Sequence, residues 1–487
     1  MSDFGRSLAG LPVCVAGLGV SGPPAARLLA ARGAVVTAVD SRDDPGIRAV
    51  AAELAASGVR VLLGPDRARA VPEGTRLVVT SPGWPPTAPL LAAAAREGIE
   101  IMGDVELAWR LRPRLAGGGE QAWLAVTGTN GKTTTVRMLG LMLAAAGRHA
   151  IAAGNVGTSL ADVISEPVPY EVVAAELSSF QLHWSSTVTP LAAAVLNVAA
   201  HHLDWHGTME AYAADKARIF APGTIAVGNA DDDRAARMAE QAAAAGGRTV
   251  LFRLSEPGPG ELGVAGGFLV DRAFGAPGGE RLAQVAVLAR AGAGGASPGR
   301  PPAPHNVANA LAAAALARAY GVPAGAVAAG LAGFRPDPHR ISFVASVGGV
   351  DYVDDSKATN PHAATASLAA FDPVVWIAGG QLKGAEGDLD GLVQAAAKRL
   401  RGVVLLGADR GKLAAALARH APDVPVVEIT STDTGTMDEV IAAAAGLAGP
   451  GDTVLLAPAA QSFDMFRDYP ARGEAFADAV RRLAAGR

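Results

Sequence analysis

Short runs of β-branched residues alternate with longer Ala- and Leu-rich stretches along almost the whole chain, and this pattern limits the possible folds most strongly. Parallel strands joined by crossover helices produce such a pattern, because helices pack on both faces of the sheet. We therefore predict an α/β protein. The predicted strands are residues 13–16, 35–39, 77–80, 124–126, 172–175, 193–196, 374–378, 403–406 and 454–457.

Three interruptions divide this pattern. A chain of 487 residues exceeds one ordinary core, and typical domain sizes predict about three domains. We interpret residues 112–121 as a linker and the Gly- and Pro-rich residues 291–304 as a surface loop of the middle domain. Two prolines in residues 334–339 end a helix before another strand-rich section. The predicted domains are 1–117, 118–335 and 336–487.

Composition narrows the location and the partners. The formal net charge is -4, and no Lys/Arg cluster forms the stripe expected of a nucleic-acid binder. The N-terminus lacks the pattern of a secretory signal, and no run of about 18 strongly apolar residues is present. The single cysteine, Cys14, is interpreted as a buried small hydrophobe. We expect a cytoplasmic protein without nucleic-acid partners or membrane insertion.

The first candidate site is a glycine segment, GLGVSG at residues 17–22, between a predicted strand and a helical run. Glycines permit a tight turn and the close approach of a phosphate to a helix N-terminus. Asp40 ends the next strand and could accept a hydrogen bond from a ribose hydroxyl. Taken alone, the segment predicts a dinucleotide enzyme; a glycine turn that serves only packing is the alternative.

The second candidate site is the strand–loop–helix segment TGTNGKTT at residues 127–134. Backbone N–H groups of such a loop surround phosphates, Lys132 supplies a positive charge, and Thr133 offers a hydroxyl to Mg²⁺. The usual spacing places glycine where Val126 stands, so this loop is a shortened variant. An oxidoreductase does not need this loop, and a simple ATPase does not need the glycine segment.

A third group of residues suggests a metal site. Glu176 ends the predicted strand 172–175, and a carboxylate there, beside a phosphate loop, is where Mg²⁺ is expected in open sheets. His202 and Asp204 lie in the segment AAHHLDWHG, and Lys216 lies in a predicted helix. The residues alone do not distinguish His202 from an ordinary loop histidine, and they favour a solvated lysine at position 216.

Several motifs occur in one order: GTNGKTTT, GNVG with Asn155, ELSSFQL from Glu176, HNVANA from His305, DSKATN from Asp355, and a C-terminal Ser462-Phe463 with residues 467–469. Together they closely resemble the Mur ligase family over essentially the full length, and most of all its D-glutamate-adding members. The resemblance implies a Rossmann-like N-terminal domain, a central P-loop ATPase domain with a parallel sheet, and a Rossmann-like C-terminal domain.

The resemblance also implies an activity. Such a protein would be an ATP-dependent ligase that adds D-glutamate to UDP-N-acetylmuramoyl-L-alanine through an acyl phosphate, as a monomer, in peptidoglycan precursor synthesis. Another Mur-type amino-acid ligase is the alternative within the same class. A nucleotide-binding protein without catalysis is a rival from another class, and the presence of Glu176, Lys216, Lys357 and Lys383 argues against it.

The same resemblance implies which residues contact each substrate. The UDP-substrate group is Val20, Ser21, Asp40, Arg42, Gly83, Asn155 and His202. The ATP group is Gly128, Thr129, Asn130, Gly131, Lys132, Thr133, Thr134, Asn306, Asn309, Arg340 and Asp355. The D-glutamate group is Lys357, Thr359, Lys383, Ser462, Phe463 and Tyr469.

The remaining group concerns metal and catalysis. The resemblance implies that Thr133 and Glu176 bind one Mg²⁺, and that His202 and a carbamoylated Lys216 bind a second. Lys132, Glu176, His202 and Lys216 would be the catalytic residues. The family usually has an aspartate where His201 stands, which leaves open which of the two histidines is used; the register favours His202.

Overall fold

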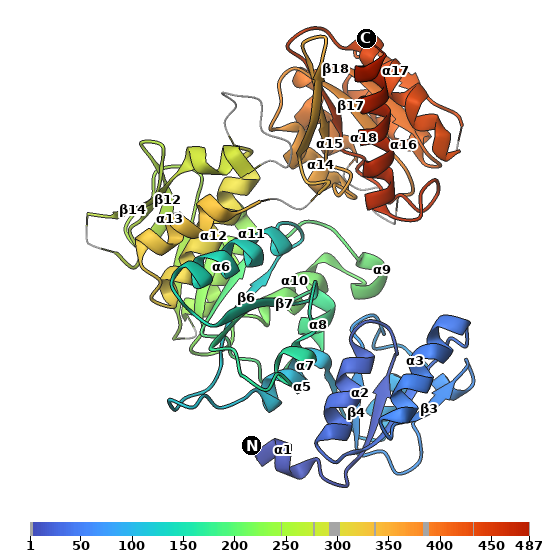
Figure 1. Cartoon of the computed structure of the whole chain (residues 1–487), viewed down its shortest axis with the longest axis vertical. Coiled ribbons are helices and arrows are strands. Elements are labelled where there is room, and N and C mark those ends of the chain that lie inside the picture. Colours follow the sequence, from blue (N-terminus) through green and yellow to red (C-terminus); the bar gives the residue numbers. More distant parts are fainter. Residues whose placement is uncertain are drawn as a thin grey trace.

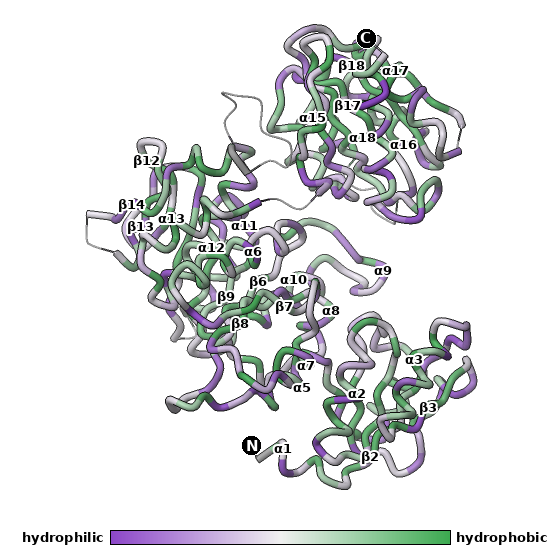
Figure 2. The backbone as a smooth tube through the Cα atoms, viewed as in Figure 1, coloured by the Kyte–Doolittle hydropathy of each residue, from purple (hydrophilic) through white to green (hydrophobic). Residues whose placement is uncertain are grey.

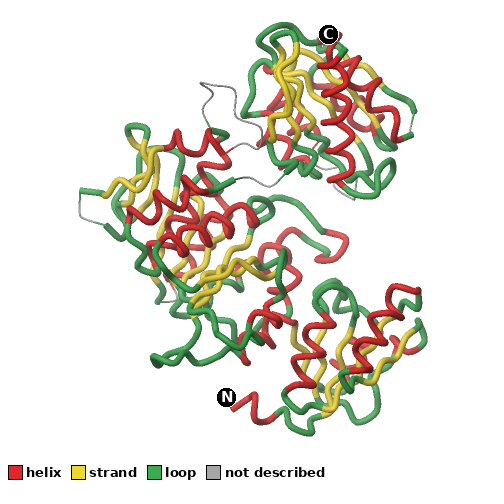
Figure 3. Tube along the Cα trace, in the orientation of Figure 1, coloured by secondary structure: helices red, strands yellow, loops and turns green. Residues whose placement is uncertain are grey.

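The chain forms three bodies, each built around its own sheet (Figure 1). The computed structural model describes residues 3–244, 246–275, 278–291, 302–335, 338–382, 389–431 and 433–486. Helices flank the strands in each body (Figure 3). All nine predicted strands coincide with observed strands, so the predicted α/β class is confirmed.

The first sheet has the order β3-β2-β1-β4-β5, and its strands are parallel. Its strands are β1 (Pro12–Ala16), β2 (Val35–Asp40), β3 (Arg60–Leu63), β4 (Leu77–Thr80) and β5 (Glu100–Gly103). The helices here are α1 (Asp3–Ser7), α2 (Gly22–Ala31), α3 (Pro45–Ala56), α4 (Pro89–Arg96) and α5 (Asp104–Leu111). Cys14 is fully buried in β1, as predicted, and burial raises the pKa of its thiol to about 12.

The central sheet has the order β14-β13-β12-β11-β10-β9-β6-β8-β7. Its strands are β6 (Ala122–Thr127), β7 (Ala150–Gly154), β8 (Val172–Glu176), β9 (Ala192–Val195), β10 (Ile225–Asn229), β11 (Arg248–Phe252), β12 (Glu261–Ala265), β13 (Phe268–Asp271) and β14 (Glu280–Gln284). Only the pairs β12–β13 and β13–β14 are antiparallel. Most of the predicted loop 291–304 lies outside the described residues.

Helices of the central body connect these strands. They are α6 (Lys132–Ala145), α7 (Leu160–Val163), α8 (Ser179–His183), α9 (Leu203–His206), α10 (Met209–Ala217), α11 (Asp233–Ala244), α12 (Pro304–Ala319) and α13 (Ala324–Gly333). The two long Ala-rich helices α12 and α13 both pack on α6, which begins at the phosphate loop. The core of this body therefore supports the loop from behind.

The third sheet has the order β15-β16-β20-β17-β18-β19, with only β15 antiparallel. Its strands are β15 (Ser342–Val347), β16 (Val350–Asp354), β17 (Val374–Gly379), β18 (Leu400–Leu406), β19 (Val426–Glu428) and β20 (Thr453–Leu456). Its helices are α14 (Pro361–Leu368), α15 (Leu389–Ala396), α16 (Arg410–His420), α17 (Met437–Leu447) and α18 (Tyr469–Ala485). Across the stretches that the structure describes, no helix combines the length and the apolar character needed to cross a bilayer.

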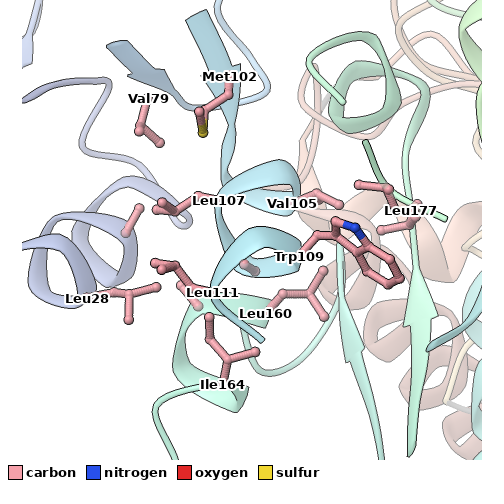
Figure 4. Packing of buried hydrophobic residues seen from close by; sticks show 14 of the residues in the cluster. Leu28, Val79, Met102, Val105, Leu107, Trp109, Leu111, Leu160, Ile164 and Leu177 are labelled. Atoms are coloured by element: carbon pink, nitrogen blue, oxygen red, sulfur yellow. The ribbon is translucent and has the colours of Figure 1, made fainter. Parts of the chain in front are cut away.

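The hydrophobic residues concentrate along the strands and the helix faces that cover them (Figure 2). Helix α5 joins the first two bodies, because its side chains pack against both. Figure 4 shows Leu107 and Leu111 near Leu28, and Trp109 beside Leu160 in the same cluster. The predicted boundary near residue 117 falls in the loop after α5. The boundary near 335 falls between α13 and β15, and we retain both as a proposed division.

A glycine on α13 permits its close approach to α6. A Cβ atom at Gly330 would lie 2.6 Å from the backbone N and Cα of Met142 in α6. Real Cβ atoms do not tolerate that separation, so any side chain would push the two helices apart. Because α6 begins at Lys132, this contact influences the position of the phosphate loop.

We predict that Gly330→Ala destabilises the protein by about 1–3 kcal/mol, the usual range for overpacking. Gly325 lies on the same helix with nothing within 4 Å of its virtual Cβ, and provides the matched control. Gly325→Ala should leave stability unchanged or raise it by up to about 1 kcal/mol, because alanine favours helix. Urea unfolding of both variants measures the difference, and equal stabilities would contradict the packing argument.

Candidate functional site

The carboxyl ends of three adjacent parallel strands meet at one edge of the central sheet. Strand β6 lies between β8 and β9, and Val126 is in register with Glu176 on one side and Ala194 on the other. The chain passes from β8 across β6 to β9, so the direction of winding changes here. Open α/β sheets bind ligands at such a point, because loops from neighbouring strands diverge and leave a crevice.

The phosphate loop follows β6 and is held by an asparagine from the loop after β9. Asn197 accepts from the backbone N–H of Asn130 at 2.9 Å and donates to its carbonyl at 3.1 Å. Gly131 caps α6 with a φ of 86°, in the left-handed region that glycine adopts without strain. The loop thus has a defined shape, with the N-terminus of α6 directed at the crevice. That geometry suits a phosphate.

Lys132 bends back onto its own loop. Its ammonium donates to the carbonyl oxygens of Gly128 at 3.0 Å and Thr129 at 3.1 Å. Burial lowers the pKa of Lys132, and this effect outweighs the opposing attraction of Glu176. A nearby phosphate would stabilise the charged form and give the ammonium a better partner than neutral carbonyls.

A cavity of about 310 Å³ opens in front of this loop, between the central and third bodies. Asn130 of the loop contacts His362 of α14 across it, with 2.9 Å between Nδ2 and Nδ1. The lining contains every predicted ATP residue except Gly128, together with four residues predicted for other roles. The predicted lining residues are Thr129, Asn130, Gly131, Lys132, Thr133, Thr134, Asn155, Glu176, Asn306, Asn309, Arg340, Asp355, Lys357 and Thr359.

Glu176 has the chemistry of a metal ligand. Its carboxylate is buried, and Oε1 accepts from the Asn155 side chain at 3.1 Å. Oε2 is also buried, yet it has no hydrogen-bond partner among the described residues. A buried carboxylate oxygen without a partner is costly unless a cation or a donor completes it. With the Thr133 hydroxyl in the same cavity, the residues fit Mg²⁺, which prefers oxygen ligands.

The protein supplies only part of a coordination shell. In the described ranges, no group of three or more His, Cys, Asp or Glu side chains could hold a metal ion. Mg²⁺ commonly binds through one or two carboxylates together with substrate phosphates and water. The predicted metal residues therefore suit an ion that arrives with a nucleotide.

Lys216 lies behind the phosphate loop instead of in the cavity. It is only 1% exposed, and its Nζ donates to the Gly128 carbonyl at 2.9 Å. The interpretation as a solvated helical lysine is therefore wrong. Burial, followed by repulsion from Lys132, lowers the pKa of Lys216 well below its ordinary value.

The two adjacent histidines occupy different places. His201 lines the cavity, whereas His202 is exposed and packs its ring 4.7 Å from that of Phe180. Burial, followed by repulsion from His202, Lys132 and Lys216, lowers the pKa of His201 to about 3. Its ring is therefore neutral at pH 7. The histidine next to the phosphate loop is therefore His201, and the register had favoured His202.

The residues predicted for the UDP-substrate lie mainly on the first sheet. The loops after β1, β2 and β4 carry Val20, Ser21, Arg42 and Gly83 at neighbouring carboxyl ends, and Asp40 is the last residue of β2. The side chain of Val20 is available, since the residue is 89% exposed. Asp40, by contrast, is buried and accepts from the backbone N–H of Leu18 at 2.7 Å. It shapes the glycine segment in addition to any contact with a ligand.

The glycines of residues 17–22 also have a packing role. A Cβ at Gly22 would collide with the backbone carbonyl of Gly17, which adopts a φ of 94°. The packing alternative therefore applies to these two positions, while Gly19 has open space around it. Both explanations of the segment are compatible.

The residues predicted for D-glutamate follow adjacent strands of the third sheet. Lys357 and Thr359 follow β16 and line the cavity, whereas Ser462 and Phe463 follow β20 and do not. The Lys357 ammonium lies 3.9 Å from the ring centroid of Tyr469, which links the two loops. Lys383 lies outside the described residues.

The lining also contains residues that were not assigned to the site. Among them are Asn197 and His362, and His201 is the histidine that the register did not favour. Asn197 directly follows a predicted strand, and that position at a carboxyl end was the available signal. His362 belongs to the third body, and no local sequence pattern indicates its contact with the central body.

Comparison with known proteins gives matches along the whole chain. The sequence profile of the MurD-like N-terminal domain of Mur ligases matches residues 12–103, that of the Mur ligase middle domain matches 126–317, and that of the Mur ligase glutamate ligase domain matches 339–460. A UDP-N-acetylmuramoylalanine–D-glutamate ligase of Thermobifida fusca is 59% identical, covering 98% of this chain and 99% of the relative. That of Streptomyces avermitilis is 56% identical over 98% and 99%.

A solved structure resembles the fold. The pseudomurein peptide ligase type C of Methanothermus fervidus superposes with a TM-score of 0.58, at 16% identity, and covers 97% of this chain and 100% of that one. At this identity the likeness concerns the fold alone. It agrees with the three bodies described above.

We predict that Lys132→Ala lowers ATP turnover by about 10²-fold or more, because a charged donor beside the phosphates is lost. Binding of a uridine nucleotide at the loops of the first sheet should remain within about 2-fold, since Lys132 lies on the central body. Phosphate release measures ATP turnover and isothermal titration measures binding of the uridine nucleotide, with circular dichroism as the folding control. Parallel loss of turnover and of uridine-nucleotide binding in folded protein would contradict the division of roles.

Proposed function

The chain belongs to the Mur ligase family, and we propose that it is an ATP-dependent ligase that adds D-glutamate to UDP-N-acetylmuramoyl-L-alanine. The observation that carries this proposal is the single cavity in which the phosphate loop of the central body faces Lys357 and Thr359 of the third body. The relatives of 59% and 56% identity carry the name of this ligase. The product belongs to cell-wall precursor synthesis.

Each body would bind one substrate. The loops of the first sheet would hold the uridine diphosphate part, the phosphate loop would hold ATP, and the loops after β16 and β20 would hold D-glutamate. The alanyl carboxylate would then extend from the first body toward the cavity, where Asn155 and Glu176 lie. This division follows the positions of the assigned residues on the three sheets.

The first chemical step joins two anions. An oxygen of the alanyl carboxylate attacks the γ-phosphorus of ATP, an O–P bond forms, and the bond from that phosphorus to the bridging oxygen breaks, so that ADP leaves. Lys132 reduces the repulsion between these anions, and the N–H groups of the phosphate loop stabilise the transferred charge. The product is an acyl phosphate.

The second step forms the amide. The neutral amine of D-glutamate attacks the carbonyl carbon, a C–N bond forms, the C–O bond to phosphate breaks, and the amine loses a proton. Water would compete as a nucleophile, so the two bodies that enclose the cavity must exclude it. Lys357 has the charge to orient a carboxylate of the incoming amino acid.

Mg²⁺ at Glu176 and Thr133 would neutralise phosphate charge and favour in-line transfer. The finer proposal is that a second Mg²⁺ binds at His202 and a carbamoylated Lys216. The burial of Lys216 and the lowered pKa of its amine support it, because only the uncharged form of an amine reacts with CO₂. Electron density at Lys216 in a nucleotide-bound crystal tests the modification; an unmodified side chain would contradict it.

We further propose a cytoplasmic monomer, without nucleic-acid partners, because all its substrates are small and the substrate sites are assigned within one chain. Another Mur-type amino-acid ligase is the alternative function. Sedimentation equilibrium tests the oligomeric state, and a stable dimer would contradict it.

We predict that phosphate release requires ATP, UDP-N-acetylmuramoyl-L-alanine and D-glutamate together. Omitting either UDP-N-acetylmuramoyl-L-alanine or D-glutamate should reduce the steady rate of phosphate release at least about 10²-fold. Without the first substrate the acyl phosphate is not formed, and without the second it is not consumed. Replacing D-glutamate with L-glutamate, L-lysine or diaminopimelate provides the matched control for specificity. Release that persists without UDP-substrate would indicate a simple ATPase, and preference for another amino acid would favour the alternative ligase.

A further inference from the structure

Three short helices beside the phosphate loop meet at one buried carboxylate, Asp215 of α10. Nδ1 of His183, from α8, lies 3.0 Å from both carboxylate oxygens. Nδ1 of His206, from α9, lies 3.0 Å from Oδ2. The Asp215 side chain is 8% exposed, and the His206 side chain is 0% exposed. A single acidic side chain thus joins α8, α9 and α10.

The contacts define which ring nitrogen carries each proton. An ionised carboxylate only accepts hydrogen bonds, so both histidines present Nδ1–H to Asp215. In a neutral ring, Nε2 of His206 is then an acceptor, and the Ser179 hydroxyl 3.0 Å away donates to it. Ser179 belongs to α8, so His206 connects α8 and α10 a second time.

A serine, a histidine and an aspartate in this order also occur in hydrolases. That function does not fit here, because Ser179 is only 3% exposed and lacks access for an acyl substrate. The ring of His206 instead stacks on Phe180, with centroids 5.3 Å apart and planes at 7°. The contacts of Ser179, His206 and Asp215 therefore serve packing between the helices.

Each helix joined at Asp215 carries, or lies directly after, one residue assigned to metal binding. Glu176 ends the strand that leads into α8, His202 caps α9, and Lys216 follows Asp215 on α10. Adjacent residues of a helix point about 100° apart. Asp215 accordingly contacts α8 and α9, while Lys216 contacts the phosphate loop at Gly128.

Short helices need such support. Helix α8 has 5 residues and α9 has 4, and Leu203 and Asp204 of α9 are exposed. Helices of this length are not stable on propensity alone, so side-chain contacts must fix their positions. The bonds of His183 and His206 to Asp215, with that of Ser179 to His206, fix the three helices relative to one another, and Arg218 adds an ion pair to Asp215 at 3.3 Å.

We propose that Asp215, acting through His206 and His183, is a positioning residue for the three segments whose residues are assigned to Mg²⁺ binding, namely Glu176, His202 and Lys216. This proposal rests on the metal-binding role given to those residues in the proposed function. Asp215 touches neither substrate nor metal; it sets the places of the three segments that do.

The test uses Mn²⁺ as the probe and needs no turnover. Electron paramagnetic resonance titrations with a non-hydrolysable ATP analogue measure Mn²⁺ binding by wild type, Asp215→Asn, His206→Ala and His206→Asn. Loss of a residue that orients metal ligands typically weakens metal binding by about 10–100-fold, and we expect this for Asp215→Asn and His206→Ala. His206→Asn can place an amide donor near Asp215 and should retain binding within about 3-fold of wild type.

Glu210→Gln is the matched control, because Glu210 is an exposed carboxylate on the same helix. It should bind Mn²⁺ as wild type does. In metal-free protein, nitrogen-15 spectra of labelled histidine should show Nδ1–H forms for His183 and His206, and Asp215→Asn should alter them. Circular dichroism confirms that each variant is folded.

Two results would overturn the proposal. One is unchanged Mn²⁺ binding in folded Asp215→Asn; the other is equal binding by His206→Ala and His206→Asn. If Asp215→Asn does not fold, the two His206 variants decide. Failure of the proposed ligase activity is a separate outcome, since it appears in product formation and not in Mn²⁺ binding.

Discussion

The register of three parallel strands determines the rest of the site. Because β6 pairs with both β8 and β9, the phosphate loop, Glu176 and Asn197 emerge at one edge. The backbone hydrogen bonds between these strands bring the three features together. The loop then acquires its shape from Asn197 and Gly131, while α12 and α13 hold α6 behind it.

Two kinds of contact connect the bodies. The first two share a hydrophobic cluster around α5, and the buried Glu106 of that helix accepts from the backbone N–H groups of Ser186 and Thr187. The polar contacts between the central and third bodies include those of Asn130 with His362 and with Asn360. An apolar, extensive contact resists movement, whereas a few polar bonds exchange readily with a ligand. The cavity lies at the second kind of contact.

Much of this could be predicted from the sequence, because periodicity fixes strands and a glycine-lysine loop fixes a phosphate site. The nine expected strands and the residues of the phosphate loop follow from such local patterns, whereas Asn306, Asn309, Arg340 and Asp355 were assigned only through the family resemblance. The burial of Lys216 could not be predicted, because the sequence of its helix does not indicate that the phosphate loop packs over this residue. The place of His201 and the Asp215 contacts depend on packing between short helices, and the antiparallel β13 and β14 fall outside the βαβ pattern.

The proposed mechanism requires that the alanyl carboxylate is phosphorylated before the amide forms. Transfer of oxygen-18 from that carboxylate to inorganic phosphate tests this order of steps. With UDP-N-acetylmuramoyl-L-alanine labelled in both carboxylate oxygens, one labelled oxygen should appear in each phosphate released, because the C–O bond of the acyl phosphate breaks in the second step. Unlabelled phosphate, with normal amide formation, would contradict the account.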